Sequence, residues 1–152
     1  MSTRANIVRE NLDDTFDSIY THWDGYPSHH GPILLTHYSN SAAVDQLMKL
    51  GDLSILGDSI GAKHDFDDKL EGACTAYGRD RGETGVESKH HESAEALAAY
   101  IKQSWTEWVY VWREADQRWY FTNNPSPTWF KCCGKEQRPT ELLTEEAIAL
   151  AS

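Results

Sequence analysis

The chain of 152 residues lacks the features that would place it in a familiar functional class. No apolar run approaches the roughly 20 residues that cross a bilayer. The first residues, MSTRAN, contain no apolar signal core. The sequence has no Walker loop, dinucleotide fingerprint, nucleophile elbow or zinc-protease helix. We therefore expect a cytoplasmic protein that does not bind membranes and does not use the common enzyme motifs.

Cysteine is scarce, which excludes a disulfide framework and argues against structural zinc. The three cysteines are Cys74, Cys132 and Cys133, and an odd number is not a disulfide pattern. The Cys132-Cys133 pair has no second pair at ligand spacing. Seven histidines are present, but none forms a His-x-x-x-His pair on a predicted helix. We expect no metal and no cofactor.

Positive charge is also scarce, and aromatic residues are abundant. The 24 acidic residues exceed the 14 Lys and Arg, which gives a formal charge of −10. No basic stretch is available to contact a phosphate backbone, so we expect no direct nucleic-acid binding. An acidic surface favours solubility and can favour basic partners. The six Trp and seven Tyr suit either a small core or a protein-binding surface.

The order of the predicted elements indicates a single α+β domain over residues 1–152. Alternating patterns and turn residues predict two β-hairpins, and the three-to-four spacing of apolar residues predicts helices. The hairpins are expected at residues 3–10 with 16–23 and at residues 108–112 with 118–122, and the helices at 33–38, from Ser41 to Gly51, from Ser93 and at 140–151. This pattern predicts an antiparallel sheet with two or three packed helices.

Other segments are expected to be irregular. Gly25, Pro27, Gly31 and Pro32 predict a loop. Residues 51–72 are rich in Gly and Asp and read as mostly irregular. The stretch CTAYGRDRGETG predicts a short strand followed by a mobile loop, and the two histidines before Ser93 look like an exposed loop.

The stretch YTHWDGYPSHHG, residues 20–31, is the densest group of polar and aromatic side chains. On an extended strand Tyr20, His22 and Asp24 point the same way. A carboxylate beside an imidazole can orient it and raise its pKa, as acid–base catalysis requires. The same pair also serves to lock a turn, and Asp before Gly is what a turn alone favours. Tyr26 completes this candidate ligand-binding group.

A second candidate group is YGRDRGE, residues 77–83. In an extended segment Arg79 and Arg81 lie on one face, and two guanidiniums at that spacing can hold a phosphate or carboxylate. Glu83 belongs to the same candidate site. The arginines can instead pair with nearby acids, in which case their role is structural. The aromatic stripe Trp108, Tyr110 and Trp112 is expected in the core, because no cations accompany it as in single-strand binders.

Four motifs together resemble a family of small proteins encoded by bacteriophages, prophages and plasmids. They are MSTR at the start, HWDGYP, GDLS and RDRGE, and the match spans roughly residues 1–85. The resemblance implies an accessory protein of a mobile element and implies no particular chemistry.

Two functional hypotheses follow. The first is a binding protein that interferes with a host defence or regulatory component, so that its partner is a host protein. The second is a small-ligand binder or hydrolase-like enzyme for an anionic, nucleotide-like substrate. In this second hypothesis His22 is the acid–base group, Asp24 orients it, and Arg79 and Arg81 hold the substrate. The second hypothesis requires the two motifs to meet in one cavity.

Overall fold

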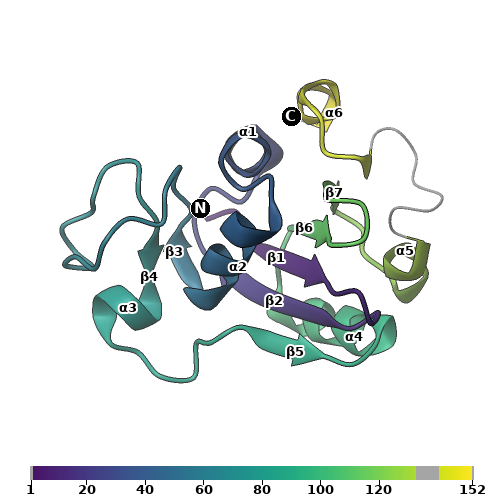
Figure 1. Cartoon of the computed structure of the whole chain (residues 1–152), viewed down its shortest axis with the longest axis horizontal. Coiled ribbons are helices and arrows are strands. Elements are labelled where there is room, and N and C mark those ends of the chain that lie inside the picture. Colours follow the sequence, from purple (N-terminus) through teal and green to yellow (C-terminus); the bar gives the residue numbers. More distant parts are fainter. Residues whose placement is uncertain (1, 133–140, 152) are drawn as a thin grey trace.

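The N-terminal residues fold back on themselves as a β-hairpin, and this hairpin lies inside the sheet. β1 (Ala5–Glu10) and β2 (Phe16–Thr21) pair antiparallel over their full length. The structure, a computed structural model, describes residues 2–132 and 141–151 (Figure 1). Cys133 and the side chain of Cys132 lie outside the described part, so the expectation for that pair is not addressed.

The strands form one mixed sheet in the order β4-β3-β2-β1-β6-β7, with β5 also paired to β2. The added strands are β3 (Leu53–Ile55), β4 (Thr75–Ala76), β5 (Lys89–His91), β6 (Trp108–Arg113) and β7 (Arg118–Thr122). Antiparallel pairs predominate, as predicted. The pairs β1–β6 and β2–β3 are parallel. The second predicted hairpin, β6–β7, is confirmed.

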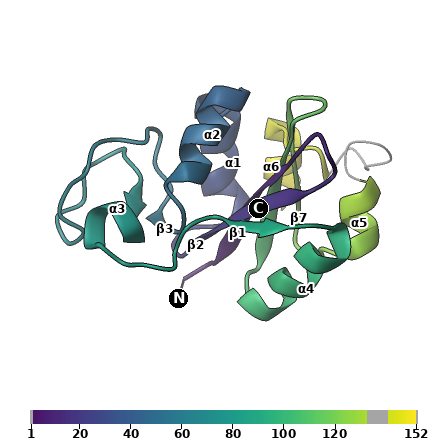
Figure 2. The same ribbon diagram turned by 60° about the horizontal axis from the view of Figure 1, so that its bottom comes forward.

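Helices cover both faces of the sheet (Figure 2). Each face has its own apolar core. The helices are α1 (Pro27–His37), α2 (Ser41–Lys49), α3 (Tyr77–Arg81), α4 (Ala94–Ser104), α5 (Pro127–Cys132) and α6 (Glu145–Ala151). Helices α1, α2 and α6 pack on one face and α4 and α5 on the other. The α+β class is therefore confirmed, with more helices than the two or three predicted.

The strand periodicity decides which side chains enter each core. Ile7, Ile19 and Tyr110 face α1, α2 and α6, whereas Val8 and Val109 face α4 and α5. The predicted stripe on β6 is core: Tyr110 and Trp112 are almost fully buried, and Trp108 packs against them half-buried. Rings of this size supply much of the buried apolar area of a small domain.

The predicted loop around Gly25, Pro27, Gly31 and Pro32 is wrong from Pro27 onward, because α1 begins there. Proline at the first helical position costs no hydrogen bond. Gly31 lets the helix approach α6, since a Cβ there would lie 2.5 Å from Ile148 Cδ1. Tertiary packing therefore overrides the breakers, and Pro32 is tolerated inside the helix.

The capping signals were largely correct. Ser93 caps α4 by accepting the N–H of Ala96 at 3.1 Å. For α2 the cap is Asn40, one residue before the predicted Ser41, and it accepts the N–H of Ala43. The expected exposed loop before Ser93 is wrong, because it forms β5 and buries His91.

Among residues 2–132 and 141–151, no helix is long and apolar enough to span a bilayer. Within the same ranges no three His, Cys, Asp or Glu side chains lie close enough to hold a metal ion.

Candidate functional site

Residues 22–26, which we call the aromatic turn, connect β2 to α1 in a conformation held by several main-chain hydrogen bonds. The main-chain N–H groups of His22 and Trp23 donate to two carbonyls of the β3 segment, each at 3.1 Å. Gly25 donates to the Thr3 carbonyl at 2.8 Å. Its own carbonyl accepts the hydroxyl of Tyr110 at 2.6 Å. The turn is therefore anchored to three separate segments of the chain.

The Asp24-Gly25 pair is required by the shape of this turn. Asp24 has a φ of 58°, in the left-handed region that Asp tolerates better than most residues. Gly25 lies against the N-terminal segment, where a Cβ would stand 2.7 Å from Ala5 Cβ and 2.8 Å from the Thr3 carbonyl oxygen. Neither neighbour is the end of a flexible side chain, so the backbone would have to move.

We expect Gly25→Ala to lower the free energy of unfolding by about 1–3 kcal/mol, the usual cost of an overpacked site. The measurement is urea unfolding, monitored by far-ultraviolet circular dichroism. Gly78→Ala, in α3, is the matched control, because its Cβ would meet its nearest neighbour, Val86 Cγ2, at an ordinary 3.4 Å. Equal stability of the two variants would contradict this account of the turn.

The predicted pairing of Asp24 with His22 is replaced by a different one. His22 Nδ1 lies 2.7 Å from the hydroxyl of Tyr20, on the same face of the extended chain. Burial and the nearby Arg4 guanidinium lower the pKa of His22, whereas the expected carboxylate partner would raise it. His22 is thus neutral at pH 7, and its ring is a hydrogen-bonded part of the turn.

The aromatic turn presents two rings to solvent. Trp23 is 44% exposed and Tyr26 is 39% exposed, although both belong to a segment whose backbone is fixed. Trp23 packs edge-on against His22 at 4.7 Å between centroids, and Tyr26 packs against His29 at 6.1 Å. Exposed Trp and Tyr on a rigid support are the side chains that most often dominate protein interfaces.

The second predicted group adopts a helix, which corrects the expected extended clamp. Residues 77–81 form α3, and Gly82 ends it in the left-handed conformation with a φ of 74°. Arg81 pairs with Glu83 at 2.8 Å on the surface, and its guanidinium lies over the rings of Phe66 and Tyr77. Arg79 and Arg81 therefore do not form a two-pronged site.

Arg79 instead joins the long loop before β4 to α3. It makes a two-point contact with Asp80 at 2.9 and 3.1 Å, and it donates to the carbonyls of Ile60 and Cys74. The Asp80 side chain is fully buried. Burial raises the pKa of Asp80, but the bonds from Arg79 and from the Ala76 and His64 N–H groups outweigh it and hold the pKa below its usual range.

The two predicted groups follow strands β2 and β4, which lie on either side of β3, but their polar side chains have different partners. Leu53 of β3 pairs with Thr21 on one side and Ala76 on the other, which places the start of α3 near the end of β2. His22 is bonded to Tyr20, whereas the Arg79 guanidinium is turned to the loop carbonyls. The contacts of both groups support structural roles.

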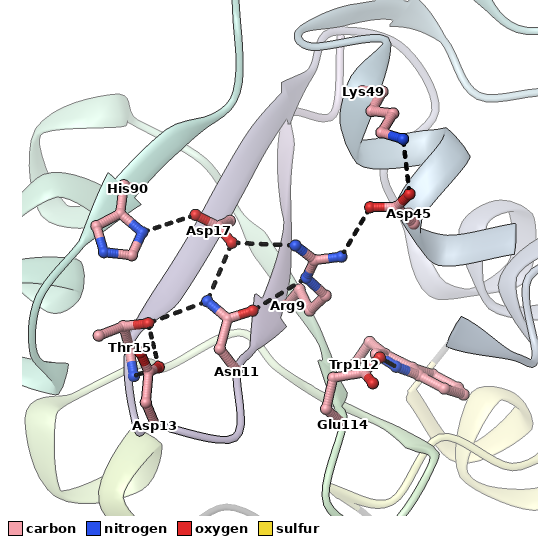
Figure 3. A network of polar contacts seen from close by, with 10 residues as sticks. All are labelled: Arg9, Asn11, Asp13, Thr15, Asp17, Asp45, Lys49, His90, Trp112 and Glu114. Atoms are coloured by element: carbon pink, nitrogen blue, oxygen red, sulfur yellow. Dashed lines mark hydrogen bonds and ion pairs between the residues drawn. The ribbon is translucent and has the colours of Figure 1, made fainter. Parts of the chain in front are cut away.

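A polar network that the sequence did not reveal lies at the other end of the β1–β2 hairpin (Figure 3). Arg9 bonds Asp17 and Asp45, each at 3.3 Å, and His90 of β5 donates to Asp17 at 2.9 Å. The hydrogen bond that His90 donates to Asp17 raises the pKa of His90. Lys49 also contacts Asp45 at 2.9 Å. An open cleft of about 770 Å³ borders this network, and its basic side chains Arg9 and His90 both contact carboxylates.

No family model, curated protein or solved structure matches the chain at a significant level. The function must therefore be inferred from the residues and geometry described above.

Proposed function

We propose that the protein acts by binding another protein and that the aromatic turn is its contact surface. The observation that carries this proposal is the combination of a rigid backbone with exposed Trp23 and Tyr26. Ordered aromatic side chains lose little entropy when a partner covers them.

The charge of the chain supports a protein partner with a basic surface. A formal charge of −10 speeds the approach of an oppositely charged partner and disfavours acidic ones. The resemblance to phage and plasmid proteins supplies the biological setting. In that setting the partner is a component of the host's defence or regulation, which the protein binds and inhibits.

The test is capture of a host protein by the tagged chain, followed by titration of the purified pair. The double variant Trp23→Ala, Tyr26→Ala should weaken the complex about 30-fold or more, the effect of removing an interface hot spot. Added salt should slow association without abolishing binding, because the charge acts mainly on the approach of the two proteins.

Leu12→Ala is the matched control. Leu12 is 77% exposed and lies at the opposite end of the β1–β2 hairpin from the aromatic turn. The Leu12→Ala variant also removes exposed apolar surface, but it leaves residues 22–26 unchanged. Absence of any specific partner, or equal loss with Leu12→Ala, would overturn the proposal.

A further inference from the structure

Helix α4 has one face in the core and an ordered stripe on its outer face. Ala94, Leu97 and Ile101 are buried against the sheet. The outer stripe consists of Glu95, Ala98, Ala99 and Lys102, at relative positions i, i+3, i+4 and i+7 on one side of the helix, and of Trp105 at its end. Ala98 lies at the edge of this stripe, because it also packs against the core. None of these residues belongs to the aromatic turn, so this surface is independent of the proposed function.

Trp105 is the most exposed large apolar side chain among the described residues. It is 82% exposed and ends α4 in the left-handed conformation, with φ 57° and ψ 30°. This conformation costs a residue other than Gly, Asn or Asp roughly 1–2 kcal/mol. The fold thus keeps the Trp105 side chain exposed to solvent even though its backbone conformation is unfavourable.

Two hollows border the stripe. One, of about 690 Å³, lies between α4 and the Pro125–Pro127 segment and extends along the helix from Glu95 to Trp105. The other, of about 290 Å³, lies at the start of α4 and is lined by apolar Phe16, Ala94 and Phe130 among charged neighbours. Glu95 borders both hollows, so they follow one another along the helix.

The stripe is complementary to itself in the antiparallel direction. A twofold axis passing between Ala98 and Ala99 brings Glu95 of one copy beside Lys102 of the other, and the reverse. The small alanines at the axis let two helices approach to about 8 Å. At about 1.5 Å of rise per residue, Trp105 then reaches the level of the other copy's Glu92, which lines the smaller hollow.

We propose that two copies of this chain associate through α4 and that Trp105 of each copy occupies the hollow at the start of the other copy's α4. The stripe carries one Lys and one Glu, so it is balanced even though the whole chain is acidic. Glu95 already contacts Lys131 of its own chain, and in the dimer it lies between two lysines. Burial of two Trp side chains supplies the main stabilisation.

The first test is sedimentation velocity of the full chain over a range of concentrations, which should show a monomer–dimer equilibrium. Trp105→Asn should raise the dissociation constant about 30-fold or more, because Asn keeps the left-handed conformation and removes the ring. Trp23→Ala should leave the dimer unchanged, which separates this inference from the proposed function. A single monomeric species at high concentration, or a dimer insensitive to Trp105→Asn, would overturn it.

A second test addresses the antiparallel geometry. Lys102→Glu alone places two acids together at both contacts of the dimer, and Glu95→Lys alone places two lysines together, so each variant should be monomeric. Mixed in equal amounts, they should form a heterodimer in which both contacts pair opposite charges. A mixture that associates no more than its components would contradict the antiparallel arrangement.

Discussion

Replacing Arg79 with methionine should lower the free energy of unfolding by about 3–5 kcal/mol, the cost of breaking a buried ion pair by removing one partner. The variant leaves the fully buried carboxylate of Asp80 without its guanidinium. It also removes the donor to the carbonyls of Ile60 and Cys74. Because these contacts join the loop before β4 to α3, we expect loss of structure there first. Urea unfolding and amide hydrogen exchange of residues 57–82 measure the two effects.

Arg81→Met is the matched control two residues away on the same short helix. Its partner Glu83 is on the surface, and such pairs contribute about 0–1 kcal/mol. Methionine retains the packing over Phe66 and Tyr77. We therefore expect a loss of about 1 kcal/mol or less, with no change in exchange. Similar losses for the two variants would mean that Arg79 does not stabilise the loop as its contacts indicate.

The elements that could be predicted from sequence are those specified by local patterns. The alternation on either side of Asn11–Asp14 gave the β1–β2 hairpin, and the period-two stripe on β6 gave the second hairpin. Ser93 identified the start of α4, because an N-cap acts on the helix that directly follows it. In these segments the residues that decide the structure are close together in the chain.

The elements that were missed depend on distant contacts. Helix α1 contains one glycine and two prolines, Gly31, Pro27 and Pro32, which locally predict a break, and it forms because it packs on α6. The parallel pairing of β1 with β6 joins segments about a hundred residues apart, which no local pattern specifies. The same holds for β5, whose pairing with β2 buries His91.

The turn at residues 22–26 could be located from the sequence, but its side-chain contacts could not. The turn at His22 and Asp24 exists where expected, yet the ring bonds Tyr20, two residues back on the same face. Asp24 contributes to the turn through its left-handed backbone conformation. The network around Arg9 gave no signal, because its partners come from β2, α2 and β5. Only the fold brings such groups together.

The protein should lose stability as the pH falls from 7 to 5, chiefly because of His30. This residue is fully buried beneath the aromatic turn, with Nε2 2.9 Å from the Thr21 hydroxyl. Burial lowers its pKa to about 3, so the folded state holds the ring neutral. The unfolded chain takes up a proton below about pH 6.5, which favours unfolding. The expected loss between pH 7 and pH 5 is roughly 1–2 kcal/mol.

A fall in pH has opposite effects on stability through His30 and through His90. Because Asp17 raises the pKa of His90, protonation there stabilises the fold below about pH 6.5, and this contribution is lost as the pH rises through the folded-state pKa. His30→Gln should therefore be less stable at pH 7 but flatter between pH 7 and 5, whereas His90→Gln should steepen the loss toward acid. Urea midpoints at half-unit pH steps measure both slopes. Identical slopes of stability against pH in the wild type and in His30→Gln would show that the His30 imidazole does not control the loss of stability in acid. The packed turn above His30 would then have to tolerate a protonated imidazole.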